Sequence, residues 1–330
     1  MPFPLFRLPL VALTEVIKTF EIRHLFPLSM CSKRMHLVVR NLRDKSIEWK
    51  LDLKTNNFTT YLSLSVKNTS ETLLDLRVTA ISNPQLEGWS VDEYPGAVFQ
   101  EDFFDSGFES YWEDRKNGTR CLMKHVCNLF GAKVEKVFVD QNLWLLDLVE
   151  ELQGPKSYDA YCKKARRTDE QFRHLLVDLN PTSLSILSKP SKQFRIDNFN
   201  MTYDDLHVTG DWITWENLRN LDCVRLLVQK TFTVAVMNRF LRHVLLEGGA
   251  ARMTEFRAQV ENIDENGILD GIREVLAPIP GKMQFEDDEG SWKFSGTLAR
   301  GDESVFVSIE CVQDLQPTIY LCIGEEKELF

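Results

Sequence analysis

At 330 residues, the chain is longer than one hydrophobic core usually supports, so two or three structural units are expected. Hydrophobic residues make up 43% and charged residues 27% of the sequence, which is the balance of a globular protein. The formal net charge of −10 excludes a protein that clamps nucleic acid along its whole length, because phosphate binding needs clustered lysine and arginine.

The N-terminal residues are apolar, but they do not form the pattern of a signal peptide. Pro4 and Pro9 interrupt the apolar stretch, Arg7 lies inside it, and no small-residue cleavage site follows. No segment of the sequence has the roughly 18 consecutive apolar residues that a membrane helix requires. We therefore expect no membrane partner and a location in the cytoplasm or the nucleus.

Three short helices are predicted in the first 44 residues. The second covers residues 25–30, and Ser32 is placed to cap the third. Three such helices bury little by themselves, so they usually need a neighbouring surface. We expect a discrete unit over residues 3–44 that is joined to the remainder by few contacts. The apolar positions of the first and third helices are Leu10, Leu13, Val16, Ile17 and Phe20, and Met35, Val38, Val39 and Leu42.

The hydrophobic period changes to that of strands after Lys45. Apolar and polar residues alternate over 47–53, 61–66 and 73–81, with polar turns between them, which predicts antiparallel strands. Residues 83–117 are rich in glycine, proline, acidic and aromatic residues and are predicted to be irregular.

After Gly131 the pattern becomes strand, helix, strand. The clearest helix is predicted from Val234 to Glu247, capped by Thr233, with Phe240 and Leu241 buried. The strands on either side of it begin 30 residues apart, the length of one unit of a leucine-rich-type solenoid. The predicted strands of this part are 136–141, 193–197, 205–210, 223–229 and 253–260, followed by a small sheet of 291–300, 304–312 and 317–323.

Known catalytic and cofactor motifs are absent from the sequence. It contains no G-x-S-x-G, Walker phosphate loop, G-x-G-x-x-G or H-E-x-x-H pattern. Cys121, His125 and Cys127 are of the types that bind zinc, but no second pair lies at finger spacing, which favours ordinary buried residues. The seven cysteines include no C-x-x-C pair and indicate free thiols. We predict no catalytic residue, no metal and no cofactor.

The N-terminal helices carry a recognisable motif. Leu8 and Pro9, the stripe through Phe20, and the run Leu28-Ser29-x-Cys31-Ser32-Lys33-Arg34 together resemble an F-box of the nematode kind. A second resemblance covers Trp212-Ile213-Thr214, residues 223–230 and 238–243, and Gly248-Gly249, which look like the type-two F-box-associated domain of the same proteins. The tail from Ser295 to Cys311 also looks like the end of that family.

The resemblance implies a fold and a set of partners. The predicted fold class is α/β, with an N-terminal three-helix F-box followed by a mixed α/β, leucine-rich-repeat-like strand-helix domain with small antiparallel sheets. The F-box would bind a Skp-type adaptor, and through it a cullin, while the associated domain would recruit an unidentified protein substrate for ubiquitination. The expected boundaries are 1–44 for the F-box, 45–130 for short strands and an irregular segment, 131–262 for the strand-helix domain, and 263–330 for a C-terminal helix and small sheet.

The family's docking motif also implies the adaptor-binding residues, which are Leu8, Pro9, Leu13, Ile17 and Leu25. The adaptor is acidic in that family, and residues 1–44 hold seven basic and three acidic residues, a local charge of +4. A solvated basic face on the third helix is the other explanation of this charge. The alternative function is a leucine-rich-type protein-binding scaffold that is not linked to ubiquitination.

Overall fold

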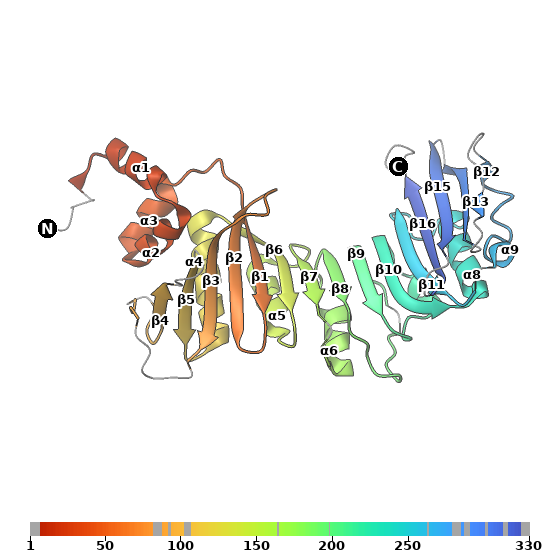
Figure 1. Ribbon diagram of the computed structural model, residues 1–330, viewed down its shortest axis with the longest axis horizontal. Coiled ribbons are helices and arrows are strands. Elements are labelled where there is room, and N and C mark those ends of the chain that lie inside the picture. The colour runs from red at the N-terminus through yellow and green to blue at the C-terminus, as the bar shows by residue number, and fades with distance from the viewer. Residues whose placement is uncertain are drawn as a thin grey trace. The chain divides into compact units, whose positions relative to one another are not determined.

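The computed structural model describes residues 7–81, 88–91, 94–101, 107–163, 165–197, 199–262, 264–278, 285–286, 291–300, 303–312 and 316–324. The chain divides into two compact units, residues 1–161 and 162–330 (Figure 1). No helix among the described residues is long and apolar enough to cross a membrane.

Three helices open the first unit, as the sequence predicts: α1 (Leu10–Thr19), α2 (Ile22–Met30) and α3 (Lys33–Leu42). Ser32 caps α3, since its side chain accepts a hydrogen bond from the Met35 backbone N–H at 3.1 Å. The helices bury one apolar stripe each. The three helices are followed by mixed sheets, whose strands lie within residues 49–139 and 183–324. This arrangement confirms the predicted α/β fold class. The buried apolar residues of the stripes are Leu13, Ile17, Leu25, Phe26, Met30, Met35 and Val39.

A mixed sheet comes next in the same unit, in the order β6-β1-β2-β3-β5-β4. Neighbouring strands are antiparallel in the pairs β1–β2, β2–β3 and β4–β5, and parallel in the pairs β1–β6 and β3–β5. The strands are β1 (Trp49–Thr55), β2 (Thr59–Val66), β3 (Thr72–Ala80), β4 (Val98–Glu101), β5 (Gly107–Trp112) and β6 (Lys133–Val139), with β7 (Asp159–Cys162) beside β6 at the boundary of the unit.

One face of this sheet is covered by helices. Helix α4 (Arg115–Phe130) packs against β2, β3 and β5, and α5 (Trp144–Gln153) packs against β6 (Figure 1). Strand side chains alternate between the faces, so Leu51, Leu62 and Leu76 are buried under the helices while the residues between them point to the opposite face.

The second unit begins with parallel strands, as a leucine-rich-type arrangement requires. Strands β8 to β11 pair in parallel in chain order, and α8 lies between β10 and β11 in the chain. Phe240 and Leu241 of α8 are fully buried, which confirms the prediction for this helix. The elements are β8 (Ser183–Ile186), β9 (Thr202–Thr209), α7 (Trp215–Arg219), β10 (Asp222–Phe232), α8 (Val234–Leu245) and β11 (Glu255–Val260).

The second unit ends in antiparallel strands that continue from β11 in the order β16-β15-β14-β12. This confirms the predicted C-terminal sheet. These strands are β12 (Ala277–Pro278), β13 (Phe285–Glu286), β14 (Trp292–Arg300), β15 (Glu303–Val312) and β16 (Thr318–Gly324), and the unit's shorter helical elements are α6 (Asp169–Arg173), the π-helical turn His174–Asp178 and α9 (Glu265–Ile268).

Two local predictions are wrong. Residues 193–197 form no strand, because side chains rather than a neighbouring strand bond their carbonyls: Arg173 donates to the Arg195 carbonyl at 3.1 Å and Asn217 to the Ile196 carbonyl at 2.9 Å. The segment 83–117, predicted to be irregular, contains β4 and β5 and the start of α4. Its glycine and acidic residues are typical of loops, so the sequence pattern did not predict these two short strands. Strand β5 pairs with β3.

Candidate functional site

The candidate site is the three-helix unit, and a buried chain of hydrogen bonds fixes it to the rest of the first unit. Ser29 of α2 lies 2.7 Å from His125 Nε2 of α4, and the Tyr94 hydroxyl lies 2.8 Å from His125 Nδ1. The Ser29 hydroxyl itself donates to the Phe26 carbonyl at 2.6 Å. Ser29 therefore accepts from His125 Nε2–H, and Nδ1 accepts from Tyr94, which sets the tautomer of a neutral imidazole.

Burial keeps this imidazole uncharged. His125 is only 6% exposed. Loss of solvation lowers its pKa from 6.5 to about 3, and the neighbouring His36 adds to the effect. Because both ring nitrogens are occupied by hydrogen bonds within the chain, His125 has no lone pair left for a metal ion. It acts as a structural link between α2, α4 and the segment that carries Tyr94.

Further contacts extend along α2 and α3. The Phe26 and Phe108 rings lie 5.5 Å apart, His36 Nε2 lies 2.9 Å from Asn128 Oδ1, and Arg43 Nε donates to the Leu129 carbonyl at 2.6 Å. The expectation that few contacts join the helices to the remainder is therefore wrong. Three small helices expose too much apolar surface alone, and here α4 and β5 cover part of it.

The five residues predicted to bind an adaptor lie in two different environments. Leu13, Ile17 and Leu25 are buried within the chain, at 7%, 0% and 3% exposure. Leu8 is half-buried and Pro9 is exposed at the N-cap of α1, where its carbonyl accepts from the Leu13 backbone N–H at 2.9 Å. Of these five, only Leu8 and Pro9 present side chains at the surface.

An exposed apolar surface continues from Pro9 into the first turn of α1. Leu10 is 69% and Val11 is 76% exposed, although both are branched aliphatic residues. The hydrophobic period places Leu10 on the buried stripe, and it gives Val11 no role. The sequence held one sign that Val11 is exposed: it lies one residue away from the apolar stripe, at a position where a soluble helix normally carries a polar residue.

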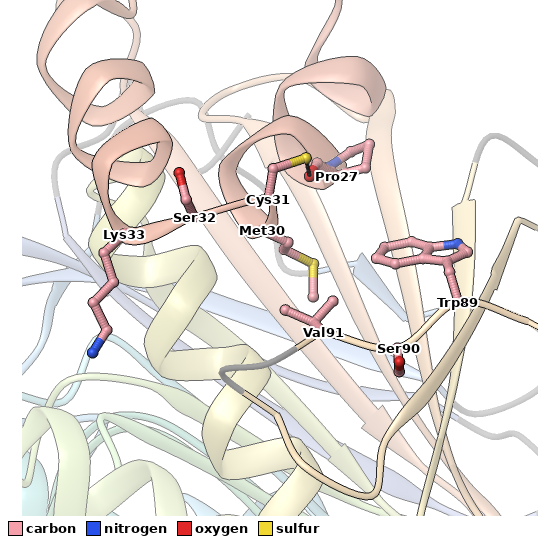
Figure 2. Close-up of a pocket in the computed structure, with 8 residues that line it drawn as sticks. All are labelled: Pro27, Met30, Cys31, Ser32, Lys33, Trp89, Ser90 and Val91. Atoms are coloured by element: carbon pink, nitrogen blue, oxygen red, sulfur yellow. Dashed lines mark hydrogen bonds between the residues drawn. The ribbon is translucent and has the colours of Figure 1, made fainter.

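A hollow of about 400 Å³ lies beside α2, between its C-terminal end and the segment after β3 in the chain. Figure 2 shows Met30 and Val91 pointing toward one another, with the Trp89 ring beside them and Lys33 directed away. Cys31 Sγ lies 3.5 Å from the Pro27 carbonyl. This lining is mainly apolar and holds no pair of acid and base. It suits an apolar side chain better than a reaction.

The other zinc candidates also behave as packing residues. Burial raises the pKa of the Cys127 thiol to about 11, which disfavours the thiolate that a metal or a nucleophilic reaction needs. Desolvation likewise raises the pKa of Cys121. Across the described parts of the chain, no three His, Cys, Asp or Glu side chains are grouped closely enough to hold a metal ion.

Comparison with protein families matches residues 5–47 to the F-box domain. The match spans α1, α2 and α3, and it confirms an F-box at the N-terminus. It does not bear on the nematode kind of that F-box, and no family match covers the residues that resemble the type-two F-box-associated domain. No curated protein and no solved structure gives a significant match to the chain.

Proposed function

We propose that this chain is a substrate-recruiting F-box subunit of a Skp-cullin-F-box ubiquitin ligase. The observation that carries the proposal is the coincidence of the F-box match at residues 5–47 with a three-helix unit held on an α/β body. F-box domains in general support this role, and proteins that contain them are generally non-catalytic. Residues 3–44 would bind a Skp-type adaptor, and residues 131–330 a protein substrate, in the cytoplasm or the nucleus.

The surface supports an adaptor interface at the start of α1. Pro9, Leu10 and Val11 expose apolar side chains there, and Leu8 is half-buried beside them. Apolar anchors that lose all contact with water on binding dominate the affinity of most interfaces. Leu13, Ile17 and Leu25 would act by holding α1 and α2 in position, since their side chains are already enclosed. The local charge of +4 would steer an acidic partner toward this end of the chain.

The test is the affinity of the full chain for a Skp-type adaptor, measured by calorimetry. Leu8→Ala combined with Pro9→Ala is expected to weaken binding at least tenfold, because truncating an interface anchor costs roughly 2 kcal/mol. Helical circular dichroism should stay unchanged, since Pro9 donates no backbone hydrogen bond and lies outside the helix.

The matched control is Val177→Ala with Val275→Ala, which truncates two exposed apolar residues of the second unit and should leave adaptor affinity unchanged. Undiminished adaptor binding by the folded Leu8 and Pro9 variant would contradict the proposed interface. Failure of the unmodified chain to bind any Skp-type adaptor would favour a scaffold that is not linked to ubiquitination.

A further inference from the structure

A row of aromatic and cationic side chains crosses the first unit's sheet on the face opposite α4 and α5. Strand register defines it: Lys54 of β1 lies opposite Phe138 of β6 and Tyr61 of β2, and Tyr61 lies opposite Arg77 of β3. Tyr161 of β7 extends the row, since its ring stacks on Phe138 with centroids 4.8 Å apart and an interplanar angle of 15°. We call these five residues the aromatic row.

This face is accessible in the first unit. Side chains that alternate with the aromatic row point the other way and are buried, such as Leu53, Leu62 and Val137. Helices α4 and α5, which pack on the sheet, cover that buried side (Figure 1). Lys54 is exposed, and the four other members of the row are half-buried.

The chemistry of the aromatic row is that of a binding surface rather than of a solvated sheet. The Arg77 guanidinium lies 5.8 Å from the centre of the Tyr61 ring and pairs with Glu109 at 3.0 Å. Glu109 also accepts from the Tyr111 hydroxyl at 2.6 Å, so Arg77 is held in place. Aromatic residues and arginine are enriched at the centres of protein interfaces, and rigid side chains lose little entropy on binding.

Lys54 gives the row its specificity. It stands between Phe138 and Tyr61, and no ion pair with it appears among the described residues. An ammonium group flanked by two aromatic rings complements a carboxylate flanked by apolar side chains.

The length of the aromatic row sets the length of its partner. The distance from Tyr161 to Arg77 spans four inter-strand spacings of about 4.8 Å, or roughly six residues of extended chain.

We propose that the aromatic row binds an extended segment of a partner protein, in which an aspartate or glutamate faces Lys54 and apolar or aromatic residues contact Phe138, Tyr161 and Tyr61. This surface is distinct from the F-box helices, and the inference holds whether or not those helices bind an adaptor.

The acidic neighbours of the row favour a peptide over nucleic acid. The adjacent row toward the other end of the strands contains Asp52 and Asp75, which face each other across Ser63. Lys136 lies opposite Asp52 on β6, and Asp159 also lies near Asp52, so acidic side chains outnumber basic ones there. A phosphate backbone laid on this face would meet these carboxylates, and the chain as a whole carries a charge of −10. A peptide with one acidic residue avoids most of this repulsion.

The experiment pans a phage library of random dodecapeptides against the full chain and measures the enriched peptides by fluorescence anisotropy. The expected peptides carry an acidic residue between apolar or aromatic residues. Lys54→Glu should weaken their binding roughly tenfold or more, because it reverses the charge that the peptide carboxylate faces. Tyr61→Ala should weaken it as well, with an unchanged melting temperature showing that the sheet is intact.

Lys50→Glu is the matched control, since it makes the same charge change on the same strand and face, about 13 Å from Lys54. Its binding should remain within about twofold of the unmodified chain. The inference is overturned if no peptide is enriched, if the enriched peptides lack acidic residues, or if Lys54→Glu and Lys50→Glu bind equally. It is also overturned if a twelve-nucleotide uridine RNA binds the chain more tightly than the peptides do and Lys54→Glu abolishes this RNA binding.

Discussion

His125 ties two sequence-distant elements together through both of its ring nitrogens, and this role depends on its being neutral. Because Nε2 carries the proton that Ser29 accepts, the neutral ring leaves Nδ1 to accept from the Tyr94 hydroxyl. In the sequence, His125 stands out only beside Cys121 and Cys127, as a zinc candidate. Its real partners lie 96 and 31 residues away, so no local pattern could identify them.

Stability should therefore depend on pH through His125. Its folded pKa of about 3 lies below the ordinary 6.5, so below pH 6.5 the unfolded chain binds a proton that the folded chain does not. This contribution to stability is complete above pH 6.5 and is lost as pH falls toward 3, by at most about 1.4 kcal/mol per pH unit. In urea unfolding, His125→Gln should show a shallower decline than the unmodified chain. Parallel curves for the two proteins would contradict this role.

Helix caps and regular strands could be predicted from the sequence, because residues close together in the chain determine them. The Ser32 cap of α3 and the Thr233 cap of α8 are encoded within a few residues, and both are present. The same holds for β1, β2 and β3, whose alternation is regular. The predicted stripe of α1 is buried at Leu13 and Ile17 but exposed at Leu10. Strand β5 escaped prediction because its parallel pairing with β3 is set by distant residues rather than by its own period. Packing between the helices, which the local sequence does not determine, also decides that Leu13 is buried while Val11 is exposed.

The packing of α4 on the sheet depends on a missing side chain at Gly118. A Cβ there would lie 2.4 Å from Cγ of Trp112, and the buried Trp112 ring is enclosed by Phe99 and Tyr94 at centroid distances of 6.1 and 5.7 Å. Alanine normally stabilises a helix by about 1 kcal/mol relative to glycine. Here we expect Gly118→Ala to lower the free energy of unfolding by about 1–3 kcal/mol, because the overpacked core must shift.

Chemical denaturation of the purified chain measures this change. Lys116→Ala, at an exposed position of the same helix, is the control and should stay within about 0.5 kcal/mol of the unmodified chain. A neutral or stabilising Gly118→Ala would show that α4 can move away from β5 at little cost, and that the helix positions the F-box residues less firmly than the Ser29–His125 link implies.

For the whole molecule, the division at residue 161 determines where the chain can be cut. The F-box helices belong to a unit whose core includes β6 and α5, so the helices and the sheet should fold as one body. Cutting at residue 130 would remove β6, expose the buried Leu51 and Leu53 beside it, and leave α4 without α5. Cutting at 161 leaves these contacts in place.

We therefore expect a protein of residues 1–161 to unfold in one cooperative transition and to bind a Skp-type adaptor within about threefold of the full chain. A protein of residues 1–130 should lose the cooperative transition, because the apolar surface that β6 and α5 bury, including Val134, Val137 and Leu146, would be gone or unpaired. Far-ultraviolet circular dichroism during thermal unfolding, with calorimetry against the adaptor, compares the two. If residues 1–130 unfold cooperatively and bind as well as 1–161, then β6 and α5 are not required to fold or position the three helices.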